Sequence, residues 1–256
     1  MGKIIAITNQ KGGVGKTTTS VNLSACVAEA GRRTLIIDID PQGNATSGLG
    51  AADFRHTVYE VLLGSIGAEQ AVVDTGFDGL KLIPSGIALA GAEIELVGLD
   101  EREGLLKAAL SKLRDSFDYI FVDCPPSLGL LTLNALTAAD SVLVPIQCEY
   151  YALEGVGQLM NTVKLVRRKL NPNLAVEGIV LTMFDARTNL GAQVVSEVRK
   201  HFPKEAFEAV IPRNVRLSEA PSYGIPIHRY DARCNGTAAY RALAAELIGR
   251  NEGKAR

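Results

Sequence analysis

A glycine-rich run near the N-terminus constrains the fold of this chain more than any other feature. Residues 9–18 read Asn-Gln-Lys-Gly-Gly-Val-Gly-Lys-Thr-Thr. The run follows a short apolar, β-branched segment, 3–8, which predicts a buried strand. It precedes 17–28, which contains no glycine or proline and predicts a helix. A strand, a glycine-rich turn and a helix in this order are the setting of a phosphate-binding loop.

The residue types within the run suit phosphate binding. Its glycines permit positive φ, so that successive backbone N–H groups can face phosphate oxygens. The Lys16 ammonium can reach the outer phosphates, and the Thr17 hydroxyl can ligate Mg²⁺. The run fits G-x-x-x-x-G-K-[ST] except that Gln10 replaces the first glycine, and a second lysine, Lys11, lies inside the loop. A glycine-rich turn that merely precedes a lysine is the alternative, and both flanks argue against it. The residues expected to bind the nucleotide here are Lys11, Gly12, Gly13, Val14, Gly15, Lys16, Thr17 and Thr18.

Strand-like and helix-like segments alternate along the rest of the chain. Continuous Ile/Val/Leu strands that alternate with helices predict an α/β fold, a doubly wound, mainly parallel sheet with helices on both faces. We find no linker or repeat and expect residues 1–256 to form a single domain. Beyond the first strand and helix, we expect strands at 34–38, 80–83, 119–123, 141–145, 177–182 and 207–211, an irregular segment at 39–54, and helices at 58–63, 88–97, 101–116, 130–139, 152–170, 192–201 and 238–248.

Acidic residues end two of the predicted strands. Ligands of such sheets bind at the carboxyl ends of the strands, which places Asp38, Asp40 and Asp123 beside the glycine-rich loop. Mg²⁺ prefers oxygen ligands and keeps several waters, so Asp123 suits the role of holding a metal-bound water near Thr17. A helix cap is the alternative role for an aspartate at a strand end, and the nearby loop favours the metal.

Several segments together indicate a family. Residues 11–17 resemble the deviant Walker A loop of the ParA/MinD ATPases, a branch of the P-loop NTPases. Residues 38–46 and 123–127 resemble the second and third motifs of that branch. Segments 147–155 and 211–221 are similar to ParA/Soj chromosome-partition proteins specifically. The resemblance extends from about residue 2 to about residue 248, which is nearly the whole chain.

The resemblance implies Mg²⁺-dependent ATP hydrolysis and assigns roles to individual residues. In the family, the residue at the position of Asp40 orients the attacking water, while Asp38 shapes the site from behind. Lys16 compensates the charge on one side of the γ-phosphate. The lysine at the position of Lys11 reaches across a dimer interface to the partner's nucleotide, so that two subunits enclose two ATP molecules. The catalytic residues implied are therefore Lys11, Lys16 and Asp40, with Thr17 and Asp123 at the metal.

The base site is less defined by the sequence. The N-K-x-D motif that reads guanine is not evident, since Thr182 is followed by Met-Phe-Asp. By resemblance, Pro212 and Asn214 lie beside adenine, with Met183 packing near it. A Pro-Arg-Asn run is also compatible with an ordinary turn.

The net charge of −1 hides an asymmetry between the halves of the chain. Residues 1–160 contain 11 Lys/Arg and 19 Asp/Glu, whereas 161–256 contain 16 and 9. Solvated helix faces, such as the basic run 167–169, can account for part of this, but charge separation is also typical of proteins with a nucleic-acid face. By resemblance, Arg187 and Arg216 bind DNA phosphates, without sequence specificity. The family further implies a ParB-type centromere-binding partner and a cytoplasmic, nucleoid-associated location.

Two rival classes within the same superfamily differ in testable features. A MinD-like positioning ATPase would end in an amphipathic membrane helix; here the apolar face of 238–248 is more simply explained by packing on the sheet. No run of 18 apolar residues and no signal peptide is present, so we expect no membrane partner. An iron–sulfur carrier would need paired cysteines. The four cysteines are scattered and make no C-x-x-C pair: Cys26, Cys124, Cys148 and Cys234.

Overall fold

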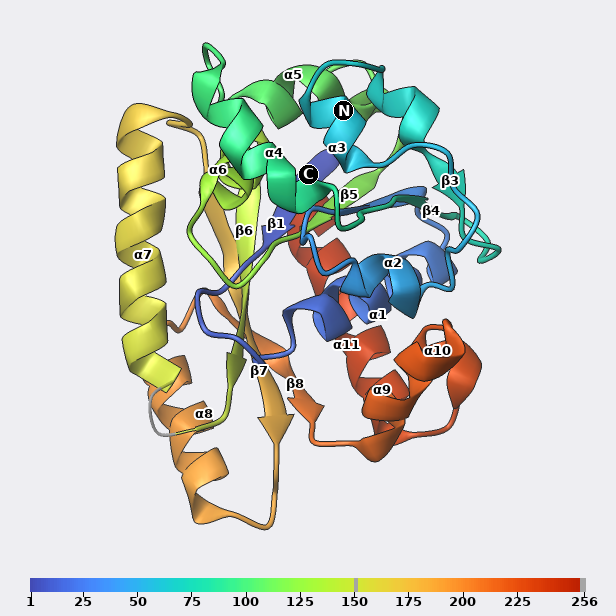
Figure 1. Cartoon of the computed structure of the whole chain (residues 1–256). Coiled ribbons are helices and arrows are strands. Elements are labelled where there is room, and N and C mark those ends of the chain that lie inside the picture. Colours follow the sequence, from blue (N-terminus) through green and yellow to red (C-terminus); the bar gives the residue numbers. More distant parts are fainter. Residues whose placement is uncertain (150–151, 254–256) are drawn as a thin grey trace.

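A computed structural model describes residues 1–149 and 152–253 of the chain (Figure 1). Its strands form one sheet in the order β3-β4-β2-β5-β1-β6-β7-β8. Neighbouring strands are parallel except β3, which pairs with β4 in the antiparallel sense. The strands are β1 (Lys3–Ile7), β2 (Thr34–Asp38), β3 (Val73–Asp74), β4 (Leu80–Ile83), β5 (Tyr119–Asp123), β6 (Ser141–Gln147), β7 (Ala175–Phe184) and β8 (Ala206–Pro212).

Helices cover both faces of the sheet, as the sequence predicts, and the fold class is confirmed. The α-helices are α1 (Lys16–Glu29), α2 (Asn44–Gly48), α3 (Val58–Leu62), α4 (Leu89–Glu95), α5 (Leu105–Leu110), α6 (Leu130–Ala138), α7 (Ala152–Lys169), α8 (Asn189–His201), α9 (Val215–Glu219), α10 (Ile227–Tyr230) and α11 (Asn235–Glu252). Short 3₁₀ turns are η1 (Ala68–Ala71), η2 (Leu96–Gly98), η3 (Arg114–Ser116) and η4 (Ala220–Tyr223).

Alternate residues of the central strands enter different cores because side chains of a strand point to opposite faces. Ile4 and Ala6 of β1 pack with buried residues of α3 to α8. Ile5 and Ile7 of the same strand pack with α1 and α11 on the other face. A third, smaller cluster lies between α1, α2 and strands β2 and β4. Both faces of the sheet are therefore covered, which explains the continuous apolar composition of its strands.

Helix α11 closes the second face. Its apolar residues Tyr240, Leu243 and Leu247 are at most 1% exposed, and they pack in the same cluster as the central strands. The expectation that this face packs on the sheet is confirmed, although the helix runs to Glu252 and is longer than predicted. Among the described residues, none of the helices has the length and apolar character needed to cross a membrane.

The predicted secondary structure is wrong in one segment of the first half. The expected helix 88–97 is found as α4 followed directly by η2, whereas the expected helix 101–116 is reduced to α5 and the short turn η3. Glu101 adopts φ +50°, which ends any helix, and Gly104 follows it. The segment expected to be irregular, 39–54, contains α2, which starts after Gly43 at φ +63°.

The adjacent strands β2, β5 and β1 bring their carboxyl ends to one edge. Asp38 pairs in register with Asp123, and Asp123 pairs with Ile7. The glycine-rich loop leaves β1 at that edge and leads into α1 (Figure 1). The topology thus places the loop and both acidic strand ends together, as the sequence predicts.

Candidate active site

The glycine-rich loop enters α1 through glycines in left-handed conformations. Gly13 has φ +73° and Gly15 has φ +84°, values that residues with a Cβ rarely adopt. Gly15 caps α1, so the N–H groups of the first helical turn face the loop. The Thr182 hydroxyl donates a hydrogen bond to the Val14 carbonyl at 2.8 Å and anchors the loop from behind. The result is a preformed site for an anion.

Lys16 lies inside this loop. The residue is 7% exposed, and its Nζ donates to the Lys11 carbonyl at 3.1 Å. Burial lowers the pKa of Lys16, while the negative charges of Asp123 and Asp40 oppose the shift. A phosphate oxygen is a stronger acceptor for an ammonium than a neutral carbonyl, so the side chain is placed to bind one.

Asp123 is fully buried at the end of β5. Its Oδ1 accepts a 2.6 Å hydrogen bond from the Ser20 hydroxyl, while Oδ2 is buried with no partner among the described residues. Burial raises the pKa of the Asp123 carboxyl and Asp38 adds to that rise, whereas the Ser20 and Thr17 hydroxyls lower it. An unpartnered carboxylate oxygen close to a hydroxyl fits Mg²⁺ and its bound waters, so Thr17 and Asp123 suit the expected ion.

Asp38 and Asp40 have different surroundings. Asp38 Oδ2 accepts hydrogen bonds from the backbone N–H and the hydroxyl of Thr46, both at 2.8 Å, and burial raises its pKa. The Asp40 carbonyl accepts a 2.7 Å bond from the Ser85 hydroxyl. The Asp40 carboxylate accepts the N–H of Gln42 at 3.0 Å and retains acceptor capacity. Asp38 therefore fastens α2 to the sheet, and Asp40 presents a carboxylate to the edge.

Lys11 and Gly12 lie on the exposed side of the loop. The Lys11 ammonium is 3.2 Å from Glu149 Oε2, with the two side chains 45% and 49% exposed. Among the residues that the structure describes, a Cβ built on Gly12 would meet no atom within 4 Å. Another molecule could approach both positions without rearrangement of the loop.

A cavity of about 400 Å³ opens beside the loop at the ends of β7 and β8. Met183, Pro212 and Asn214 line it together with Gly15 and Thr18 of the phosphate site. Met183 adopts φ +53°, which is uncommon for a residue other than glycine. The Asn214 side-chain oxygen accepts the backbone N–H that caps α9, so its nitrogen is the group that can donate to a ligand. The residues expected at a base site are thus brought together next to the phosphate loop.

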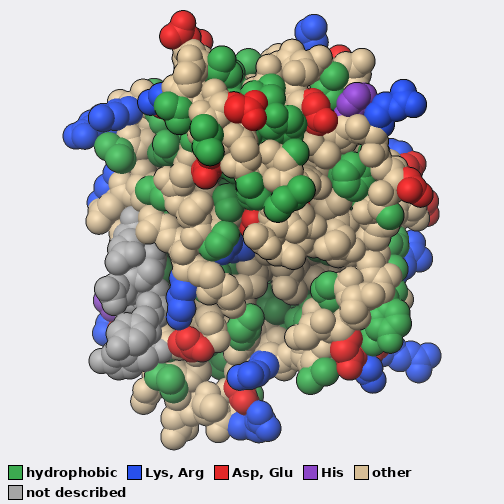
Figure 2. All heavy atoms as spheres, viewed as in Figure 1, with side chains coloured by type: hydrophobic (Ala, Val, Ile, Leu, Met, Phe, Trp, Pro, Cys, Tyr) green, Lys and Arg blue, Asp and Glu red, His purple; other side chains and the backbone are tan. Residues whose placement is uncertain are grey.

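The two candidate DNA-binding arginines lie outside this cavity. Arg187 follows β7 and its side chain is 86% exposed, while Arg216 lies in the first turn of α9 and is 53% exposed. Figure 2 shows basic side chains at the lower edge of the face, where Figure 1 places the β7–α8 connection, with acidic ones beside them.

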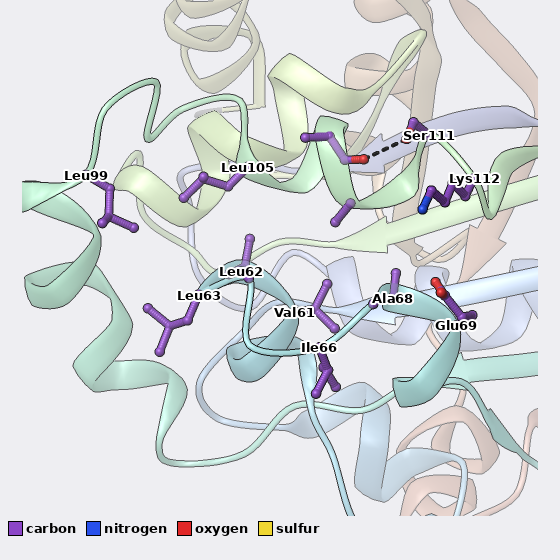
Figure 3. A pocket seen from close by; sticks show the side chains of 14 residues that line it. Val61, Leu62, Leu63, Ile66, Ala68, Glu69, Leu99, Leu105, Ser111 and Lys112 are labelled. Atoms are coloured by element: carbon purple, nitrogen blue, oxygen red, sulfur yellow. Dashed lines mark hydrogen bonds between the residues drawn. The ribbon is translucent and has the colours of Figure 1, made fainter.

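A separate apolar groove of about 290 Å³ lies between α3, η1 and α5 (Figure 3). Its walls include Leu62 and Leu105, and its charged groups are Glu69 and Lys112. The groove shares no lining residue with the phosphate loop or the base cavity, so the chemistry described above does not involve it.

The chain matches known proteins over most of its length. Residues 2–176 match the model of a family described as "AAA domain". The chain is 60% identical over 249 residues to the "Sporulation initiation inhibitor protein Soj" of Bacillus subtilis (strain 168), covering 96% of this chain and 98% of that protein. It is 56% identical to the "Chromosome partitioning protein ParA" of Myxococcus xanthus (strain DK1622), covering 99% and 90% of the two chains. The chain belongs to the ParA/Soj family of chromosome-partitioning ATPases. The resemblance inferred from its motifs is confirmed.

Solved structures support the same fold for this ParA/Soj chain. The cell division ATPase MinD of Pyrococcus furiosus superposes with a TM-score of 0.83 at 28% identity, covering 98% of this chain and all of MinD. A protein named cobyrinic acid a,c-diamide synthase, from Mycobacterium smegmatis, superposes with a TM-score of 0.87 at 39% identity, covering 99% and 97% of the chains. That structure holds an ATP analogue and magnesium.

Sequence motifs missed several polar residues that hold the ParA/Soj site in place. Ser20 lies about one turn of α1 after Lys16, and its spacing could have indicated a shared face. Thr46 belongs to the second motif, but its bonds to Asp38 depend on the path of α2. Ser85 follows β4 far along the chain and donates to Asp40, a contact that no spacing reveals.

Proposed function

We propose that this ParA/Soj ATPase is an ATP-dependent dimeric switch, which hydrolyses ATP slowly, binds DNA without sequence specificity and partitions DNA with a ParB-type partner. The observation that carries the proposal is the combination of a buried lysine in the phosphate site, Lys16, with an exposed lysine and glycine, Lys11 and Gly12, on the outer side of the loop. A loop that served ATP binding alone would not need a second, outward lysine.

ATP would bind with its phosphates in the glycine-rich loop and its adenine in the neighbouring cavity. Lys16 would exchange the Lys11 carbonyl for phosphate oxygens. The Asn214 amide would donate to the base beside Pro212. Thr17 would ligate Mg²⁺ and Asp123 would hold one of its waters; the ion, when bound, neutralises charge on the phosphates.

Hydrolysis requires a group that orients the attacking water, since phosphoryl transfer depends mainly on positioning and charge stabilisation. Asp40 would accept a hydrogen bond from that water, because its carboxylate retains acceptor capacity at the same edge as the loop. The bonds from Ser85 and Gln42 fix the Asp40 backbone and carboxylate. Asp38 would not contact the water, because it is fully buried and bound to Thr46.

Dimerisation would follow from the position of Lys11. In a face-to-face dimer its ammonium would leave Glu149 and reach the partner's nucleotide, adding positive charge where the transition state develops negative charge. Because no atom of the described residues lies within 4 Å of a Cβ on Gly12, the two loops could approach each other closely. Triphosphate binding and association would then be coupled, which is the basis of a switch.

DNA would bind to arginines of the basic second half, at Arg187 and Arg216, through backbone phosphates. A dimer carries two such surfaces on one rigid body, so the second contact becomes effectively intramolecular. A ParB-type partner would then stimulate hydrolysis and release the dimer from the nucleoid.

One set of measurements tests this function. Light scattering, DNA binding and ATPase activity are measured with ATP and with ADP, with and without the native ParB-type protein. We expect a dimer and tight DNA binding only with ATP, and faster hydrolysis only when DNA and partner are both present. Equal DNA binding with ADP would contradict the switch. Sedimentation of the ATP form with anionic liposomes instead of DNA would favour a MinD-like membrane ATPase.

A further inference from the structure

Both arginines proposed for DNA already bind a carboxylate. The Arg187 guanidinium donates from Nε to Asp185 Oδ1 at 2.8 Å and from Nη2 to Asp185 Oδ2 at 2.6 Å. The Arg216 Nη1 donates to Glu219 Oε2 at 2.9 Å. The first pair is bidentate, which is the geometry that a guanidinium also uses for a phosphate.

Each pair is local and exposed. Arg187 and Asp185 are two residues apart, and the side chain of Arg187 is 86% exposed. Arg216 and Glu219 are three residues apart on α9, with the side chains 53% and 39% exposed. Exposed pairs of this kind contribute little to folding. The Arg187–Asp185 pair is purely local, whereas Glu219 Oε2 also accepts the Tyr230 hydroxyl at 3.0 Å and so links α9 to α10. Folding stability therefore does not explain the acidic neighbour of Arg187, and it explains that of Arg216 only in part.

A third arginine, Arg213, directly follows β8, next to the end of β7. The backbone N–H of Arg213 donates to the Phe184 carbonyl at 2.8 Å, which joins the ends of β7 and β8. Its positive charge lowers the pKa of Asp185, after the larger effects of hydrogen bonds from Arg187. Arg213 is exposed, and within the described part of the chain its side chain makes no ion pair. Asp185 thus binds Arg187 and is within electrostatic range of a second arginine, Arg213, which also lines the base cavity.

We propose that Asp185 and Glu219 occupy the guanidinium positions that DNA phosphates take, so that each bound phosphate displaces a carboxylate, and that Arg213 is a further phosphate contact. This inference rests on the DNA binding proposed above. The carboxylates lower DNA affinity, because a phosphate gains the arginine only by breaking an existing ion pair. The carboxylates thus weaken the DNA contact that one subunit makes, so that tight DNA binding requires both surfaces of the dimer.

Asp185→Asn and Glu219→Gln test the proposal, because each amide keeps an oxygen and loses the charge. The amide oxygen introduced by Asp185→Asn can still accept the Arg187 backbone N–H that Asp185 accepts at 3.0 Å. We expect DNA binding by the ATP form to tighten about two- to fivefold per subunit, the range of an exposed ion pair. A dimer carries each change twice, so the effect on its affinity is about fourfold to twenty-five-fold. Arg213→Ala should weaken binding by a similar factor.

The chain offers a matched control in Asp118→Asn. Asp118 accepts Nη2 of Arg33 at 2.7 Å and the Arg33 backbone N–H at 2.8 Å, which repeats the Asp185–Arg187 arrangement. It precedes β5, at the amino edge of the sheet, whereas Asp185 follows β7 at the carboxyl edge. Asp118→Asn makes the same change in net charge away from the proposed surface and should leave DNA affinity close to that of the wild type.

A second control uses the double variant Asp185→Asn/Arg187→Ala. If Asp185 acts by holding Arg187, its removal should have little effect once that arginine is gone. Anisotropy titrations of labelled duplex DNA, at two salt concentrations, measure all variants. Equal tightening by Asp118→Asn and Asp185→Asn, or full tightening in the double variant, would overturn the inference and leave DNA binding itself intact. Absence of ATP-dependent binding by the wild type would overturn both.

Discussion

The phosphate loop serves the ATP hydrolysis proposed above, and the exposed edge that bears Arg187 and Arg216 serves the proposed DNA binding. The two regions differ in how their charged groups are surrounded. At the loop and the strand ends beside it, Lys16, Asp38 and Asp123 are at most 7% exposed, and hydrogen bonds with Lys11, Thr46 and Ser20 respectively hold them. At the edge, Arg187 and Arg216 are exposed and each is held by a neighbour in sequence. A buried charge costs free energy unless the fold supplies partners for it, whereas an exposed charge is held weakly and can readily change its partner.

The difference predicts how each region responds to substitution. A change at the loop should alter one chemical step by a large factor, because Lys16, Asp40 and Asp123 are buried and interactions between buried charges are strong. A change at the edge should alter an equilibrium by a small factor that depends on salt. The following variants test that contrast.

Asp40→Ala should have the largest effect. It removes the carboxylate expected to position water and no contact to phosphate, so ATP hydrolysis should fall about 10²- to 10⁴-fold while ATP binds as before. The ATP dimer should accumulate, which light scattering would show. Lys16→Ala is the comparison, because it should weaken nucleotide binding itself. Hydrolysis by Asp40→Ala at the wild-type rate would exclude Asp40 as the catalytic group.

Gly12→Val tests the proposed dimer interface separately from nucleotide binding. A Cβ at Gly12 meets none of the described atoms of the monomer within 4 Å, so nucleotide binding should persist while a close dimer interface is overpacked. Association with ATP should weaken about tenfold to a hundredfold. Gly13→Val provides the contrast, since Gly13 has φ +73° and its substitution should damage the loop and ATP binding directly. A normal ATP dimer of Gly12→Val, measured by light scattering, would refute the face-to-face arrangement.

Much of the phosphate loop and of the strand ends beside it could be predicted from the sequence, because the constraints there are local. β2 and β5 match the predicted ranges 34–38 and 119–123, and the loop and acidic strand ends meet since parallel strands share a carboxyl edge. The helix predicted at 88–97 is found as α4 and η2, whereas the one predicted at 101–116 was wrong, because the chain turns at Glu101, which has positive φ, and α5 ends at Leu110. Apolar periodicity does not reveal such breaks.

The remaining site contacts depend on pairs of residues distant in the chain. Ser85 reaches Asp40 across 45 residues, and Thr182 reaches Val14 across 168. Neither contact has a sequence motif. The partner of an exposed arginine was not predictable either, since its side chain can adopt many rotamers and only the folded loop selects one.

Gly224→Ala tests whether the two regions are mechanically joined. Gly50 follows α2, which leads on from the Asp40 segment, and Gly224 follows η4, which comes directly after the helix of Arg216. A Cβ on Gly224 would lie 2.6 Å from the Gly50 Cα, and Gly224 has φ +65°. The substitution should cost about 1–3 kcal/mol of folding free energy, measured by chemical denaturation. Gly76→Ala is the control, because Gly76 has φ +74° and no described atom within 4 Å of its Cβ position; it should cost only the backbone strain, about 1–2 kcal/mol, and less than the same change at Gly224.

If the Gly50–Gly224 contact also transmits the nucleotide state, Gly224→Ala should reduce the ratio of DNA affinity with ATP to that with ADP, while ATP affinity is retained. An unchanged ratio in a folded Gly224→Ala protein would show that the contact only supports the fold.

Arg216→Ala should have the smallest effect on the protein itself and a diagnostic effect on DNA binding. Its pairs with Glu219 and Asp231 are exposed, so thermal unfolding should be nearly unchanged. DNA affinity should fall alike for unrelated sequences, because a phosphate contact reads no bases. Each lost phosphate contact should reduce the slope of log Kobs against log salt by about 0.9, and a dimer loses two. Arg33→Ala removes a comparable exposed pair at the opposite edge and should leave the slope unchanged. If Arg216→Ala leaves the slope of log Kobs against log salt unchanged, the DNA binds elsewhere on the molecule. The contrast between a buried chemical site and an exposed DNA edge would then not hold at Arg216.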